Sequence, residues 1–365
     1  MNILILGGTG AMGTMLVSLL AKESKNNFIT ITSRSERKSE YSNVTYIKGD
    51  AKDTDFLKKV LSDYYDVVID FMKYGTAEFK ERYQLLLSNT DQYVFISSAR
   101  VYAQSDVPIT ENTPRLLDTV DDPEYLKTDE YALAKARCED LLNNSGKKNY
   151  TIVRPSITYG NERLQLGVLE KEGWLYRALH GRSIVFSNDI GPKYTAMTTG
   201  EDVSRGIVSL LGKPEAYGET FQITSEKSYT WNEILSCYLK VLEKEKGLKP
   251  KVVYTEKAIN LKINKYQVIY CRYFNRRFDD TKIKQFIDTD TFKDPMDGLE
   301  ECLKAFLKKP RFKSINWKLE AWNDRAAGER TPLKEIPGRK QKVYYLLYRY
   351  KLDFVADAYN RLKGK

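Results

Sequence analysis

Two residues four positions apart, Tyr131 and Lys135, have the types and spacing that proton-transfer chemistry needs. They lie in the run TDEYALAKARCE, which begins like a helix, with Thr128 as its candidate N-cap. Residues at i and i+4 share one helical face. A tyrosine has a pKa of about 10 and is a poor base at neutral pH, but a neighbouring lysine cation favours the phenolate. The pair can then exchange a proton with a substrate hydroxyl, although an isolated Tyr-x-x-x-Lys is more often an exposed helix face.

A pair of serines supplies a candidate partner for this tyrosine. Ser97 and Ser98 follow the apolar run YVFI (93–96), which reads as a buried strand. Polar residues at the carboxyl end of a central parallel strand lie where ligands bind. A serine hydroxyl there can hydrogen-bond the same substrate oxygen as the tyrosine.

The start of the chain, MNILILGGTGAMG, reads as a strand, a glycine turn and a helix, the context of a phosphate-binding motif. Gly7 allows a tight turn, Gly10 lets a pyrophosphate approach the backbone, and Gly13 lets the helix pack closely on the strand. The helix N-terminus offers free N–H groups and a positive dipole end. The residues expected to bind cofactor in this stretch are Gly7, Thr9, Gly10, Ala11, Met12 and Gly13.

The second strand, FITIT (28–32), ends in Ser33 and Arg34. A residue just after this strand usually reads the adenosine ribose, and an acid there would bind the 2′-hydroxyl of NAD. The cations here suit a 2′-phosphate, so Ser33 and Arg34 favour NADP over NAD. The alternative is a solvated basic turn.

Further strands are predicted at 44–47, 66–70 and 93–96, with helices between them. Strands that alternate with helices at this pace indicate an α/β protein with a parallel sheet built by right-handed crossovers. The continuous apolar runs VVI and YVFI fit a sheet that is covered on both faces.

Composition excludes several classes of site. The 365 residues are 42% hydrophobic, contain no apolar run of membrane-spanning length, and begin with a strand where a signal peptide would stand. The four cysteines are widely spaced and His180 is the single histidine, so we expect no metal site, no Ser-His-Asp triad and a cytoplasmic location. From residue 256 onward there are 26 Lys and Arg against 15 Asp and Glu, so the net charge of +10 belongs to the C-terminal third.

Residues 1 to about 225 resemble the extended short-chain dehydrogenase/reductase family, the NAD-dependent epimerase/dehydratase group. The matching stretches, in the family's order, are GGTGAMG (7–13), GDAKD (49–53), DVVID (66–70), FISSARVYA (95–103), YALAK (131–135), IVRPSITYG (152–160) and EDVSRGIVSLL (201–211). The resemblance implies a doubly wound, Rossmann-type parallel sheet with a smaller C-terminal substrate domain. We expect a dinucleotide-binding domain over 1–160, completed near 195–225, then a mainly substrate-binding domain over 161–310 and a basic, aromatic extension over 311–365.

By position, Ser98, Tyr131 and Lys135 resemble the family's catalytic triad. Tyr131 would be the acid/base, Lys135 would lower its pKa and hold the nicotinamide ribose, and Ser98 would bind the reacting oxygen. The resemblance also implies that Asp50 and Ala51 contact the adenine. Pro155 and Ser156 would lie near the nicotinamide carboxamide, and Phe71 and Met72 would flank the cofactor beside the fourth strand.

Departures from the family narrow the expected function. Ser98 is followed by Ala99-Arg100, where dehydratases usually carry Thr-Asp-Glu. An epimerase or keto-reductase acting on a sugar is therefore favoured, with a nucleotide sugar as the first candidate. The arginine that many members use to grip a diphosphate is Thr195 here, which puts a standard nucleotide sugar in doubt. The candidate substrate residues are Arg100, Arg163, Trp174, Lys193 and Arg272, with aromatic core packing as the alternative for Trp174.

The segment 342–365 carries Val343, Leu346, Leu347, Tyr350, Phe354 and Tyr359 among lysines and arginines. We expect a terminal helix docked on its own domain or on a second subunit of a homodimer, in preference to one lying on a membrane. Nucleic acid is not an expected partner, because the chain shows a basic patch without a nucleic-acid motif. The alternative function is a non-catalytic dinucleotide-binding regulatory or RNA-associated protein on the same fold.

Overall fold

A computed structural model describes residues 1–261 and 264–355. The chain forms two compact units, each assembled from three segments. Unit 1 comprises Met1–Gly160, Ala196–Ser228 and Arg276–Gly298, and unit 2 comprises Asn161–Thr195, Tyr229–Asn275 and Leu299–Lys365. This differs from the predicted division in two respects: unit 1 also takes in 276–298, and the extension 311–365 belongs to unit 2.

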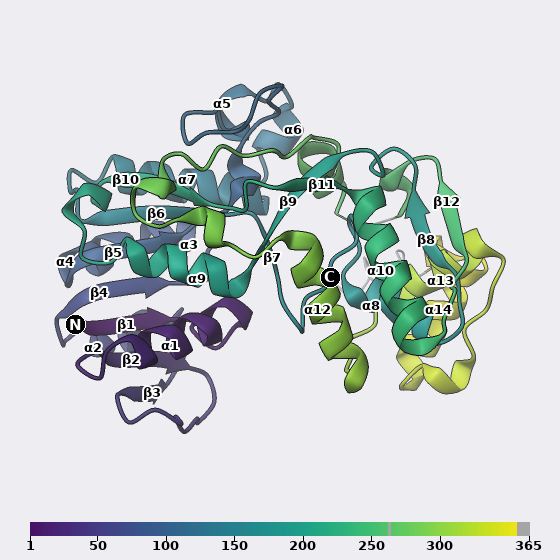
Figure 1. Ribbon diagram of the computed structural model, residues 1–365, viewed down its shortest axis with the longest axis horizontal. Helices are drawn as coiled ribbons and strands as arrows, with labels where there is room; N and C mark the ends of the chain where they lie inside the picture. The colour runs from purple at the N-terminus through teal and green to yellow at the C-terminus, as the bar shows by residue number, and fades with distance from the viewer. Residues whose placement is uncertain (262–263, 356–365) are drawn as a thin grey trace. The chain divides into compact units, whose positions relative to one another are not determined.

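Unit 1 is built on a seven-stranded parallel sheet with the order β10-β6-β5-β4-β1-β2-β3 (Figure 1). Its strands are β1 (Asn2–Leu6), β2 (Phe28–Ser33), β3 (Val44–Lys48), β4 (Tyr65–Asp70), β5 (Thr90–Ile96), β6 (Tyr150–Pro155) and β10 (Glu219–Ile223). The expected Rossmann-type fold is therefore confirmed. The point where the order reverses, between β1 and β4, is where such sheets bind ligands.

Helices cover both faces of this sheet because strand side chains alternate between the faces. Ile3 and Ile5 of β1 join an apolar cluster with α1 and α9, whereas Leu4 and Leu6 join one on the opposite face. The helices of unit 1 are α1 (Ala11–Glu23), α2 (Thr54–Val60), α3 (Thr76–Lys80), α4 (Tyr83–Ser88), α5 (Leu116–Thr119), α6 (Pro123–Leu126), α7 (Tyr131–Asn143) and α9 (Gly200–Ser209).

Three short strands lie at or next to the points where the chain passes from one unit to the other. They form a second sheet with the order β11-β9-β7: β7 (Ile157–Tyr159), β9 (Tyr194–Thr199) and β11 (Ser228–Thr230). Helix α12 (Pro295–Lys308) likewise begins within the last segment of unit 1 and continues into unit 2.

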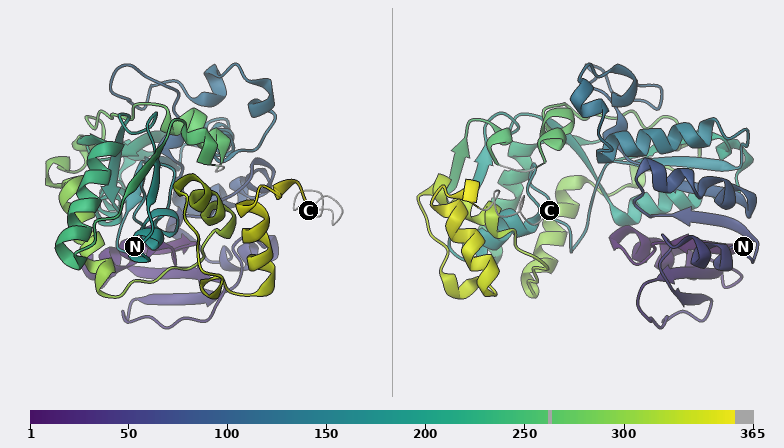
Figure 2. Two further views of the ribbon diagram at one scale, coloured as in Figure 1. Left: turned by 90° about the vertical axis from the view of Figure 1, so that its right-hand side faces the viewer. Right: turned by 180° about the vertical axis from the view of Figure 1, so that it is seen from behind.

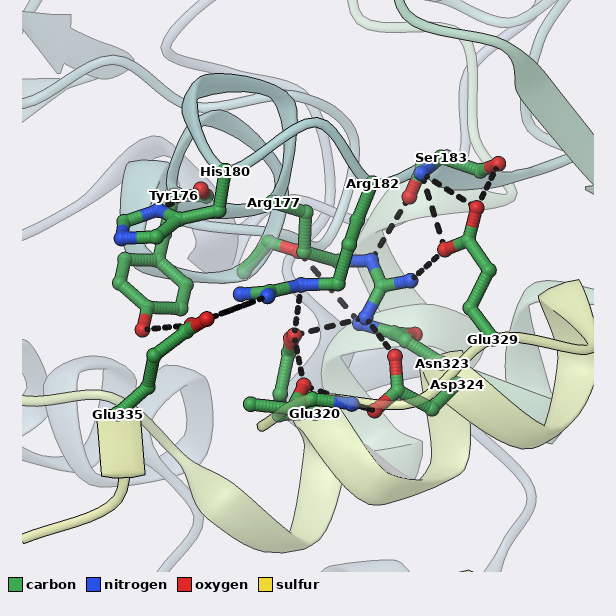
Figure 3. A network of polar contacts seen from close by, with 12 residues as sticks. Tyr176, Arg177, His180, Arg182, Ser183, Glu320, Asn323, Asp324, Glu329 and Glu335 are labelled. Carbon is green, nitrogen blue, oxygen red and sulfur yellow. Dashed lines mark hydrogen bonds and ion pairs between the residues drawn. The ribbon is translucent and has the colours of Figure 1, made fainter. Parts of the chain in front are cut away.

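Unit 2 has a parallel strand pair, β8 (Ile184–Ser187) and β12 (Val252–Thr255). Its helices are α8 (Lys171–Leu179), α10 (Trp231–Lys246), α11 (Lys265–Gln267), α13 (Trp317–Ala327) and α14 (Arg339–Arg349). The last two pack side by side, in yellow in both views of Figure 2. Buried ion pairs join α13 to α8, as Figure 3 shows.

The terminal helix is shorter than the sequence suggested. Helix α14 ends at Arg349, a turn follows at 350–351, and the part of the expected helix from residue 356 on, including Tyr359, lies outside the described residues. Tyr345 is fully buried against α13, so docking within its own unit is the arrangement adopted. No helix among residues 1–261 and 264–355 has the length and apolar character to cross a bilayer.

Candidate active site

The glycine turn after β1 forms an open cradle at the N-terminus of α1. Gly7 has φ +70°, a conformation that favours glycine, and Gly10 is the N-cap of α1 with no side chain capping the helix. A Cβ added at Gly10 would meet nothing within 4 Å. Free N–H groups beside open space fit the pyrophosphate of a dinucleotide.

Gly13 has a different reason for being glycine from the one predicted. A Cβ there would lie 2.5 Å from the carbonyl oxygen of Gly8. The close approach is therefore between α1 and the turn itself, and it fixes the shape of the cradle.

The residues expected at the adenosine end lie at the carboxyl ends of β2 and β3. Ser33 is the buried last residue of β2, and Arg34 beside it is exposed to solvent. The backbone N–H of Gly49 donates to the Ser33 carbonyl at 2.8 Å, which ties the start of the Asp50-Ala51 turn to β2. Ala51 is buried and Asp50 is exposed.

At the next strand ends, Met72 follows β4 and Ser156 follows β6. The sulfur of Met72 lies so close to the glycine turn that a Cβ on Gly7 would approach it to 2.9 Å. The hydroxyl of Ser156 hydrogen-bonds that of Thr198 at 3.3 Å, and Pro155 is buried. Phe71 and Met72 are half-buried at the same edge of the sheet as the cradle.

Lys135 is only 4% exposed and lies between the ends of β4 and β5. Its ammonium group donates to the carbonyl oxygen of Ile96 at 2.7 Å and to that of Met72 at 3.4 Å. Lys135 is in α7, one turn after Tyr131. Helix α7 begins at Tyr131, and its N-cap is Glu130, whose carboxylate accepts from the N–H of Ala132; the predicted cap at Thr128 is wrong.

Two cations flank the half-buried ring of Tyr131. The Arg100 guanidinium lies 5.3 Å and the Lys73 ammonium 5.4 Å from the ring centroid. Arg100 is also paired with Glu130 at 2.7 Å. Sequence reasoning missed Lys73, although its position directly after Phe71 and Met72 at the end of β4 is a usable signal.

The two serines after β5 have different surroundings. Ser97 is 2% exposed and donates to Glu139 at 2.5 Å, and Glu139 is itself paired with Arg154 at 2.7 Å. Ser98 is half-buried, and its hydroxyl accepts from the N–H of Arg100 at 3.2 Å. Ser97 is thus committed to the core, whereas Ser98 keeps a hydroxyl proton to donate.

A buried carboxylate, Asp70, stands behind this edge, and sequence reasoning assigned it no role. It accepts hydrogen bonds at 2.8 Å from the N–H of Met72 and from the hydroxyl of Tyr93. Burial raises the pKa of Asp70, while those two hydrogen bonds and the Lys135 cation act against the rise. The signal that could have identified Asp70 is an acidic residue at the end of a central apolar strand.

The proposed substrate residues of unit 2 fit that role poorly. Trp174 is fully buried, its indole N–H donates to the Leu164 carbonyl, and its ring stacks on Tyr238 at 4.5 Å. The expectation of a sugar-stacking ring is therefore wrong, and core packing is the correct interpretation. Arg272 is 4% exposed and donates to the carbonyl oxygen of Gly167, so it also serves the interior.

The two remaining substrate candidates lie nearer the surface of unit 2. Arg163 is exposed and lies 3.7 Å from Glu170. Lys193 is half-buried, and its backbone carbonyl accepts from the N–H of Trp231. A role in substrate binding stays a prediction for both residues.

Comparisons with known proteins agree with this geometry. Residues 7–184 match a family model described as NAD(P)H-binding. The chain is 31% identical over 254 residues to the chloroplast stem-loop binding protein of 41 kDa b from Arabidopsis thaliana, a match that covers 66% of this chain and 62% of that protein. This chain therefore spans less than two thirds of the length of that relative.

Solved structures share the fold at low identity. An epimerase from Methanothermobacter thermautotrophicus superposes with a TM-score of 0.65 at 19% identity, covering 84% of this chain and 92% of the other. A UDP-glucuronic acid 4-epimerase from Bacillus cereus, in complex with UDP-glucuronic acid and NAD, gives 0.64 at 18% identity, covering 84% and 99%.

Fold and cradle together define a protein with an NAD(P)H-binding domain of the Rossmann type. The solved epimerase structures share this fold, so the fold that the sequence resemblance implied is confirmed.

Proposed function

We propose that the chain is an NAD(P)-dependent epimerase or keto-reductase that acts on a sugar, with a nucleotide sugar as the first candidate. The observation that carries the proposal is the position of Lys135. This buried cation lies at the carboxyl ends of β4 and β5, one helical turn from Tyr131. Its two acceptors, the carbonyl oxygens of Ile96 and Met72, leave one of its three ammonium protons for a cofactor hydroxyl.

The roles of the three residues follow from their surroundings. A bound nicotinamide cofactor supplies hydride transfer. Tyr131 exchanges a proton with the substrate oxygen through its phenolic oxygen, and the Lys73 and Arg100 cations lie within 5.4 Å of its ring centroid. Ser98 donates a hydrogen bond to the same substrate oxygen and positions it. An epimerase reduces its keto intermediate again on the other face, whereas a reductase consumes the reduced cofactor.

The preferred cofactor in this proposal is NADP. Arg34 is exposed directly after β2, where the ribose of a bound dinucleotide lies in this fold. Its guanidinium suits a 2′-phosphate. The test is to denature the purified protein and identify any released nucleotide by mass spectrometry. NAD recovered near one per chain contradicts the preference for NADP and favours an epimerase, and an empty protein that binds NADPH before NADH favours a reductase.

The catalytic part of the proposal is tested by Tyr131→Phe. We expect turnover to fall by about 10³-fold, because the proton donor and acceptor is removed, while the affinity for cofactor is retained. The matched control is Tyr64→Phe, a tyrosine that is 55% exposed elsewhere in unit 1. Unchanged turnover in Tyr131→Phe contradicts the mechanism.

The cradle is tested by Gly10→Ala. A Cβ at this position meets no protein atom within 4 Å, so we expect the midpoint of thermal unfolding to stay the same. The added methyl group occupies the space in which the pyrophosphate lies, so dinucleotide affinity should fall by at least tenfold. Equal affinity in the variant and the parent places the cofactor elsewhere.

A second candidate function is RNA association. The curated relative at 31% identity is a stem-loop binding protein, and this chain has a strongly basic C-terminal third. Electrophoretic mobility shifts with a stem-loop RNA, measured over a range of salt, test this function. Tight, salt-dependent RNA binding would favour this function over the enzyme if Tyr131→Phe also left the turnover rate unchanged.

The proposal also includes a homodimer. Light scattering, which measures the mass of the protein in solution, tests it.

A further inference from the structure

The terminal helix of unit 2 is apolar on two sides. One side is anchored by the buried Tyr345 against α13. On the other side Val343, Leu347 and Tyr350 recur at i, i+4 and i+7, the spacing of a single helical stripe. Val343 is 54% and Tyr350 is 56% exposed, so the described chain leaves more than half of each of these two side chains uncovered.

The exposed apolar surface continues past the helix. Leu352 is 42%, Phe354 is 66% and Val355 is 42% exposed. With Val343 and Tyr350 they make up five of the ten exposed large apolar residues in the described part of the chain. Single exposed apolar residues are ordinary, but a concentration in thirteen consecutive residues indicates an interaction surface.

A hollow lined by cations adjoins this surface. It has a volume of about 510 Å³ and is lined by Trp322, Arg325, Ala326, Arg349, Tyr350 and Lys351. Lys351 has φ +60°, a conformation that costs a lysine free energy, so this segment is strained at the rim of the hollow. The lining contains three cations and no acid, which suits an anionic group.

The charges on α14 have the same sign. Arg339, Lys340 and Lys342 lie in its first turns, and Asp353 is the single acid between 339 and 355. The combination of exposed apolar side chains and nearby cations is typical of helices that lie in the interface of an anionic membrane. Tyrosine and tryptophan side chains favour the same depth.

We propose that this surface, made of Val343, Tyr350, Leu352, Phe354 and Val355 with the adjoining hollow, binds an anionic phospholipid membrane. The apolar side chains enter the boundary between head groups and acyl chains, and the hollow receives a lipid phosphate. A second copy of the chain fits less well, because two such faces would repel each other. RNA also fits less well, since three of the five exposed apolar side chains, those of Val343, Leu352 and Val355, are aliphatic and give a base nothing to stack on.

The first test is co-sedimentation of the full chain with vesicles. We expect binding to vesicles of phosphatidylglycerol and phosphatidylcholine and none to phosphatidylcholine alone. Binding should weaken as salt is raised, because ions screen the attraction. Absence of binding to the anionic vesicles at low salt overturns the proposal.

Variants then assign the binding to this surface. We expect the triple variant Val343→Ser, Tyr350→Ser, Phe354→Ser to lose vesicle binding with an unchanged unfolding midpoint, because all three side chains are more than half exposed. The matched control is Phe28→Ser, Tyr64→Ser, which removes two exposed aromatic rings from unit 1. Lys351→Gln should weaken binding about fivefold.

Three results contradict the proposal. One is a triple variant that binds vesicles as the parent does. Another is a parent protein that binds no vesicles, together with a triple variant whose oligomeric mass differs from that of the parent. This result identifies the face as an interface between copies of the chain. The third is a surface that binds stem-loop RNA and no vesicles. Because none of these measurements uses cofactor or turnover, the outcome is independent of the proposed enzyme.

Discussion

Two buried cations, Arg177 of unit 2 and Lys135 of unit 1, have opposite kinds of partner. In unit 2, Arg177 is fully buried and contacts Glu320 and Asp324 at 2.8 Å, Glu329 at 2.7 Å and the carbonyl oxygen of Ser183 at 2.7 Å (Figure 3). In unit 1, Lys135 donates to two backbone carbonyl oxygens and pairs with no carboxylate within 4.0 Å in the described residues.

The difference separates a structural charge, on Arg177, from a charge on Lys135 for which we propose a function. Four of the five N–H donors of Arg177 bind groups of its own chain, so this guanidinium serves to stabilise the fold. An ammonium with a remaining proton beside a half-buried tyrosine retains a charge that a ligand can use. The two sites therefore predict opposite balances between effects on stability and effects on turnover.

The largest effect on stability is expected from Arg177→Met. Removing the guanidinium leaves Asp324 buried without its cation and Glu320 with Arg182 alone, at 3.1 Å, so we expect a loss of about 3–5 kcal/mol in the free energy of unfolding. Urea denaturation measures it. The control Arg339→Met changes an exposed arginine and should stay within about 0.5 kcal/mol of the parent. A loss below about 1 kcal/mol for Arg177→Met contradicts the structural role.

Lys135→Met should show the opposite balance. It leaves two carbonyl oxygens without a donor, which costs about 1–2 kcal/mol of stability. Turnover should fall by about 100-fold or more, because the tyrosine loses its neighbouring cation. Steady-state kinetics and urea denaturation on one preparation give both numbers. If Lys135→Met loses as much stability as Arg177→Met and keeps its turnover, the distinction between the two cations is lost.

The smallest expected effect is the pH dependence of stability that comes from two buried carboxylates, Asp70 in unit 1 and Asp324 in unit 2. Burial raises the pKa of Asp70 above 3.8. The folded state therefore holds its proton more tightly, and the contribution of Asp70 to stability falls as pH rises from about 4 through its folded pKa. Burial also acts to raise the pKa of Asp324, but hydrogen bonds from Arg177 and Tyr345 bring it below 3.8. Its contribution is present above about pH 4 and is lost at lower pH.

Comparing each parent–variant difference across pH checks these signs. The stability of the parent relative to Asp70→Asn should decline as pH rises from about 4 toward neutrality. The stability of the parent relative to Asp324→Asn should decline as pH falls below about 4. If both stability differences change with pH in the same direction, the opposite pKa shifts of Asp70 and Asp324 are contradicted.

Much of unit 1 could be predicted because its signals are local. Short runs rich in apolar and β-branched residues identify β1 to β5, and glycine at Gly7 and Gly10 marks the turn whose φ and open space need that residue. The spacing of Tyr131 and Lys135 places both on one helix, although the capping residue was misplaced by two positions.

Unit 2 and the joins between segments could not be predicted in the same way. An aromatic residue in a helix looks the same whether it packs in a core or faces a ligand, and Trp174 took the first role because Tyr238 stacks on it. The return of 276–298 to unit 1 rests on contacts such as that between Phe286 and Phe221, whose ring centroids are 5.1 Å apart. Such long-range contacts leave no local pattern.

The ion-pair network of Figure 3 also has a consequence for biosynthesis. Arg177 reaches its partners Glu320 and Asp324 across 143 and 147 residues of sequence. At translation rates of about 5–20 residues per second, roughly 7–30 s pass between the synthesis of α8 and that of its acidic partners. During this interval the Arg177 side chain of α8 has water or a chaperone as its partner in place of the carboxylates. Unit 2 therefore completes its fold late, when α13 emerges from the ribosome.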